Sequence, residues 1–94
     1  MDEKRVLQMI HWIAEKAGRY SAESVLEQMR EVLESDGASA DILELVTRAA
    51  ENIPETIEEV KKSPVLTREQ LYMAKVRGDE RRKREIEAAR YGRC

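Results

Sequence analysis

Apolar side chains recur with helical spacing along most of the chain, and the most regular run lies between Ala40 and Lys62. Pro54 interrupts this run, because proline lacks a backbone N–H and its ring clashes with the preceding helical turn. We therefore expect a long central element over 40–62, kinked or split at Pro54, with two nearly coaxial segments, 40–52 and 54–62. The apolar members fall at steps of three or four residues, in one line on a helix: Ile42, Val46, Ala49, Ile53, Ile57 and Val60.

Two shorter helices are predicted before this element. The first covers residues 3–17, and Gly18 can end it in a left-handed cap. The second is expected to begin at Ser21, whose hydroxyl can accept bonds from free backbone N–H groups while Tyr20 packs on Val25. The polar side of this second helix carries four glutamates: Glu23, Glu27, Glu31 and Glu34.

A last helix is predicted after the linker at Pro64. Thr67 and Gln70 have the spacing of a capping box, so this helix should begin at Arg68. Gly78 weakens it by about 1 kcal/mol relative to alanine. Beyond Gly78 few side chains are apolar, and we expect that part to be partly helical or frayed.

Composition agrees with an all-α fold. Charged residues make up 38% of the 94 residues, aromatic residues only 4%, and there is no Phe, so aliphatic side chains must fill a modest core. We predict one domain, a small bundle of four or five helices. Residues 1–76 form the bundle in this prediction, and 77–94 form a basic C-terminal tail of the same domain.

Charge is unevenly distributed along the chain. The net charge is only −2, but residues 1–74 contain nine Lys or Arg against fifteen Asp or Glu, whereas residues 75–94 contain eight against four. The chain therefore combines an acidic body with a basic tail.

The residue types that catalysis and metal binding need are scarce. With one His and one Cys, the sequence offers no nucleophilic triad, and it contains no glycine-rich loop, HExxH motif or P-loop. His11 and Glu15 supply at most half of a metal site, and a solvated or partner-facing His11 is the favoured interpretation. Carboxylate pairs such as Glu58-Glu59 are interpreted as solvated faces. The sequence predicts no catalytic, metal or cofactor site and no enzyme.

Cellular location is inferred from what the sequence lacks. No run of about 18 apolar residues is present, and acids stand among the first residues, so neither a membrane span nor a secretory signal is predicted. We expect a cytoplasmic protein. Cys94 is interpreted as an incidental thiol, with a disulfide between two chains as the alternative.

The basic tail is one candidate for function. The four consecutive cations at residues 81–84 would surround a helix rather than form a stripe along it. This arrangement suits contacts to nucleic-acid phosphates. The alternative is a charged helix that lies against the acidic body of its own or a sister chain. The candidate nucleic-acid-binding residues are Lys75, Arg77, Arg81, Arg82, Lys83, Arg84 and Arg90.

The other candidate is an apolar protein-binding surface. Trp12 lies well away from the apolar stripe of its helix, where the surface of a monomer would leave a large apolar ring in water. Trp12 is either half covered by a neighbouring helix or packed along Lys16, or it forms a dimer or partner contact. We expect a protein-interaction module, a regulator, adaptor or inhibitor that acts through a helical surface as a homodimer. The candidate partner-binding residues are Met9, Trp12, Tyr72 and Met73.

Overall fold

The computed structural model describes residues 2–91, apart from the side chains of Arg19, Tyr20 and Tyr91, so Cys94 lies outside the described residues. Within 2–91 the chain forms helices and no strand, which confirms the predicted all-α bundle. None of these helices is long and apolar enough to cross a membrane. The five helices are α1 (Glu3–Lys16), α2 (Gly18–Ser35), α3 (Ala40–Glu51), α4 (Ile53–Lys62) and α5 (Arg68–Tyr91).

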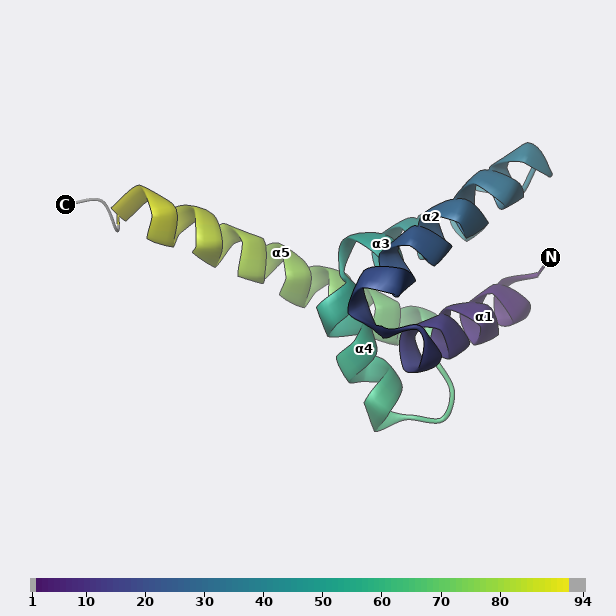
Figure 1. The fold of residues 1–94 in the computed structure, drawn as a ribbon, viewed down its shortest axis with the longest axis horizontal. Coiled ribbons are helices and arrows are strands. Elements are labelled where there is room, and N and C mark those ends of the chain that lie inside the picture. The colour runs from purple at the N-terminus through teal and green to yellow at the C-terminus, as the bar shows by residue number, and fades with distance from the viewer. Residues whose placement is uncertain (1, 92–94) are drawn as a thin grey trace.

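Helices α1 and α2 form a hairpin in which α2 runs back along α1 (Figure 1). Asp2 caps α1 by accepting a bond from the Arg5 backbone N at 2.8 Å. Gly18 has φ +75°, the left-handed conformation that the sequence predicts, and α2 starts at this same residue. Ser21 therefore lies inside α2, and its prediction as the cap is wrong. The staple predicted for the Tyr20 side chain lies outside the described part of the chain.

The central element divides at Asn52 into α3 and α4, which confirms the split predicted at Pro54. Asn52 leaves helical geometry with φ −130° and ψ 49°, and its Nδ2 donates to the Arg48 carbonyl at 2.8 Å. Because of this change in backbone direction, α4 turns away from the line of α3 (Figure 1). The expectation that the two segments are nearly coaxial is therefore wrong.

The core is aliphatic and lies where the five helices meet. The largest fully buried apolar side chains come from four of the helices: Val6, Ile10, Leu26, Leu45, Val46 and Leu71. At about 25 cal/mol per Å² of apolar surface, burying each such side chain contributes roughly 1.5–3 kcal/mol. Most of the predicted stripe of the central element is buried as well.

Helix α5 begins as predicted. The Thr67 hydroxyl accepts from the Gln70 backbone N at 3.2 Å, and the Gln70 side chain accepts from the Thr67 backbone N at 2.9 Å. The first half of α5 packs on α3 and α4, and the helix continues through Gly78. Its second half projects away from the other four helices (Figure 1), and residues 83–90 are all exposed.

Candidate interaction surfaces

The first candidate surface lies over α1 and α2. Trp12 is 62% exposed, and Met9 and Val25 are 40% and 39% exposed. These three side chains line one hollow of about 500 Å³ together with Arg5, Gln8 and Ile13. We call this set of six residues the Trp12 surface.

Helix geometry explains why these side chains remain in water. Val6, Ile10 and Ile13 form the buried stripe of α1, whereas Met9 and Trp12 lie on its flank toward α2. Val25 lies on the matching flank of α2, outside the line of its buried residues. In the sequence Val25 was predicted as the residue on which Tyr20 packs, and it was missed as a surface residue.

Tyr72 and Met73 lie elsewhere, near the start of α5. Both side chains are exposed, and the Arg48 guanidinium carbon of α3 lies 5.8 Å from the centre of the Tyr72 ring. Neither residue lines the Trp12 hollow. The four predicted partner-binding residues therefore form two separate groups.

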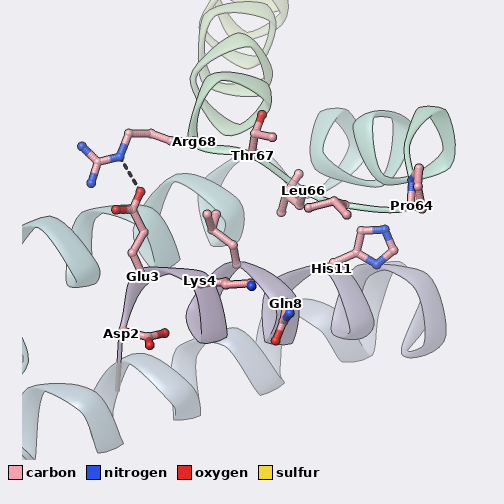
Figure 2. Close-up of a pocket in the computed structure, with 11 residues that line it drawn as sticks. Asp2, Glu3, Lys4, Gln8, His11, Pro64, Leu66, Thr67 and Arg68 are labelled. Carbon is pink, nitrogen blue, oxygen red and sulfur yellow. Dashed lines mark hydrogen bonds and ion pairs between the residues drawn. The ribbon is translucent and has the colours of Figure 1, made fainter.

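A larger groove of about 690 Å³ separates α1 from the linker before α5 (Figure 2). Leu7, Val65 and Leu66 supply its apolar lining. At one end Arg68 donates to Glu3 at 2.7 Å, an ion pair that Figure 2 marks with a dashed line. Two acids and two cations line the groove, so it presents no field of one sign to a charged ligand: Asp2, Glu3, Lys4 and Arg68.

His11 stands at the other end of this groove (Figure 2). Its Nε2 lies 3.1 Å from the Ser63 carbonyl oxygen, which can only accept, and its Nδ1 lies 3.4 Å from a Glu15 carboxylate oxygen. The side chain is 15% exposed, so the interpretation of a solvated His11 is wrong. Its contacts tie α1 to the linker. No group of three potential metal ligands occurs within residues 2–91.

The second candidate surface, the basic part of α5, is largely occupied by the chain's own acids. Arg77 donates to Glu58 at 2.9 Å and to Glu59 at 2.6 Å, and Arg81 donates to Glu55 at 2.6 Å. Glu55 and Glu59 are buried, so the interpretation of Glu59 as part of a solvated face is wrong. Charge-assisted bonds of this kind are stronger than neutral ones and attach α5 to α4.

A close contact between α5 and the α3–α4 junction lies beside these ion pairs. Gly78 packs against Asn52, where an added Cβ would lie 2.0 Å from Oδ1 and 2.8 Å from Cγ. Asn52 is fully buried, and its Oδ1 accepts from Arg82 at 3.1 Å. Arg82 also donates to the Glu51 carbonyl and to Asp79. Gly78, which appeared in the sequence only as a weak helix residue, therefore allows the two helices to approach.

The seven predicted nucleic-acid-binding residues thus divide into two sets. Four form ion pairs with carboxylates of the same chain: Lys75, Arg77, Arg81 and Arg82. Within residues 2–91, the other three form no hydrogen bond or ion pair, and all are exposed on the projecting end of α5: Lys83, Arg84 and Arg90.

The clear pKa shifts also belong to ion pairs. Hydrogen bonds from Lys75 and Arg82 lower the pKa of Asp79, and the hydrogen bond to Glu55 raises the pKa of Arg81. The hydrogen bond to Glu3 similarly raises the pKa of Arg68. Each shift favours the charge that the group already carries at neutral pH, which is typical of structural ion pairs rather than proton transfer.

No family model, curated protein or solved structure shows a significant match to this chain.

Proposed function

We propose that this protein is a small, non-enzymatic interaction module, a regulator, adaptor or inhibitor that binds a protein partner through the Trp12 surface. The observation that carries this proposal is the exposure of Trp12, 62% in water, beside Met9 and Val25 in one hollow. Tryptophan is strongly enriched among residues that dominate binding energy, because its ring buries a large area with little loss of side-chain entropy. The proposal places this activity in the cytoplasm.

The surroundings of Trp12 support a groove for a partner helix. The hollow lies between two helices, has an apolar floor, and is bordered by Arg5 and Gln8. An amphipathic helix recognises such a groove through a few apolar anchors, with polar groups at the rim. Tyr72 and Met73 lie on another face. Substitutions there can therefore show which of the two surfaces binds the partner.

Partner capture from a lysate of the native host tests the proposal. Wild-type protein should retain a partner that Trp12→Ala loses, while the helical circular dichroism of the two proteins stays equal. Tyr72→Ala is the matched control, because it removes an exposed aromatic ring from the other face. Equal capture by the wild type and Trp12→Ala would refute the proposal, and loss of helicity in Trp12→Ala would instead place Trp12 in the core.

A second candidate function is nucleic-acid binding by the projecting end of α5, supported by the exposed and unpaired Lys83, Arg84 and Arg90 within the described residues. Three such contacts correspond to a slope of about −3 for log affinity against log salt on duplex DNA. The variant in which all three become Gln should lose binding. No binding at low salt would remove this candidate.

A further inference from the structure

We infer that the partner of the Trp12 surface is a second copy of this chain, with α1 of each protomer packed across α2 of the other. This inference rests on the proposed function, since it identifies the partner of the same surface. A symmetric dimer uses one patch twice, so the patch must be complementary to itself. The α1–α2 hairpin meets this condition in its apolar side chains and in its charges.

The apolar side chains are shared between the two helices. Met9 and Trp12 extend from α1, and Val25 extends from α2 into the same hollow. A two-fold axis parallel to the two helices brings α1 of one protomer opposite α2 of the other. Each residue keeps its position along the direction of the axis. Trp12 then covers Val25 of the partner subunit, and the partner subunit's Trp12 covers Val25.

The charges match in the same arrangement. From Ala17, where the hairpin turns, Arg5 is about 3.3 helical turns away along α1 and Glu31 about 3.9 turns away along α2, so the two lie at similar levels. Both are exposed, and within residues 2–91 neither side chain forms an ion pair. The two-fold axis places Arg5 opposite Glu31 of the partner subunit, and it does so twice.

Two other acids of α2 fall outside this contact. Glu23 and Glu27 line a different hollow with α3 and Arg82, on the opposite flank of α2. Glu31 lies on the outer face of α2, opposite the buried Leu26 on the helical wheel. The inferred interface thus uses Glu31, and Glu23 is available as a control position.

The area of the Trp12-bearing face of the hairpin sets the expected affinity of the dimer. Helices of 14 and 18 residues are about 21 and 27 Å long, and two helices side by side are about 20 Å wide. The projected patch is roughly 500 Å², less than the roughly 800 Å² per partner of a standard interface. We therefore expect a reversible dimer with a Kd in the micromolar range.

Sedimentation velocity of the full chain under reducing conditions, from roughly 1 to 500 µM, brackets this expected range. Wild-type protein should pass from monomer to dimer as its concentration rises. Trp12→Ala should raise the Kd by at least about tenfold. Arg5→Glu and Glu31→Arg should each raise the Kd by about fivefold, whereas the double variant should return close to the wild type. Glu23→Arg is the control and should leave the Kd unchanged.

The outcomes separate this inference from the proposed function. A monomer at every concentration overturns the second-copy inference, and Trp12-dependent capture of another protein would still support the interaction module. A dimer that is indifferent to Trp12→Ala, or charge reversals that add instead of compensating each other, also overturns the inference. Equal helical circular dichroism of all variants shows that each of them folds.

Discussion

Gly78 provides the sharpest test of how α5 is attached, because an alanine there has no space. The added Cβ would lie 2.0 Å from Oδ1, 2.8 Å from Cγ and 3.3 Å from Cβ of Asn52. Asn52 cannot swing into water, since it is fully buried and its amide bonds to the Arg48 carbonyl and to Arg82. Gly78→Ala must therefore displace α5 or break these bonds.

Two effects of opposite sign determine the size of this change. Alanine is a better helix residue than glycine by about 1 kcal/mol, which alone would stabilise α5. Overpacking a tight contact costs about 1–3 kcal/mol, and each hydrogen bond lost from Asn52 costs about 1 kcal/mol more. We expect Gly78→Ala to lower the free energy of unfolding by about 1–3 kcal/mol and Tm by roughly 5–20 °C.

Urea and thermal unfolding followed by circular dichroism measure this loss, and Asn52→Ala supplies the control background. Removing Cγ and Oδ1 of Asn52 makes room for the new methyl group, so Gly78→Ala should then be neutral or stabilising. A Gly78→Ala variant as stable as the wild type would show that Gly78 and Asn52 do not form a tight contact. The same loss in both backgrounds would also refute it, because contacting residues should show coupling.

Two further predictions concern the ion pairs of α5. Arg81→Ala should lower the free energy of unfolding by about 1–3 kcal/mol, because buried Glu55 loses its ion-pair partner. Arg84 is exposed, so Arg84→Ala should change the free energy of unfolding by less than about 0.5 kcal/mol. Equal urea midpoints for the two variants would contradict this prediction. The pKa of Asp79 is lowered from its ordinary value of 3.8, so ionised Asp79 stabilises the fold at pH values above 3.8. This contribution is lost as the pH falls through the lowered pKa of the folded state. Asp79→Asn should therefore flatten the acid limb of stability against pH, and an NMR titration that puts the Asp79 pKa at or above 3.8 would exclude this explanation.

Local chemistry made much of the fold predictable. The start of α5 followed from Thr67 and Gln70, and the division of the central element followed from Pro54, because each depends on a few neighbouring residues. The start of α2 was not predictable in this way. The chain turns so tightly at Gly18 that α2 begins before Ser21 can act as a cap.

Contacts between distant segments set the limit of the sequence-based prediction. The close approach at Gly78 depends on Asn52, and the burial of Glu55 and Glu59 depends on arginines one helix later in the chain. The sequence indicated an acidic body and a basic tail, but it left open whether the tail would lie against that body. The charge periodicity of α5 alone does not show which cations are paired.

Trp12 supports the most direct test of the account, because it is the only tryptophan and its fluorescence reports on the proposed surface alone. Dilute protein should show emission typical of a solvent-exposed indole that a soluble quencher reaches readily, as the 62% exposure of Trp12 implies. As protein concentration rises, emission should shift to shorter wavelength and quenching should fall, with a midpoint that matches the dimer Kd. Weak quenching at the lowest protein concentration would contradict the exposure of Trp12 in the monomer. Equal quenching at every concentration and with every captured partner would contradict the binding of a partner through the Trp12 surface.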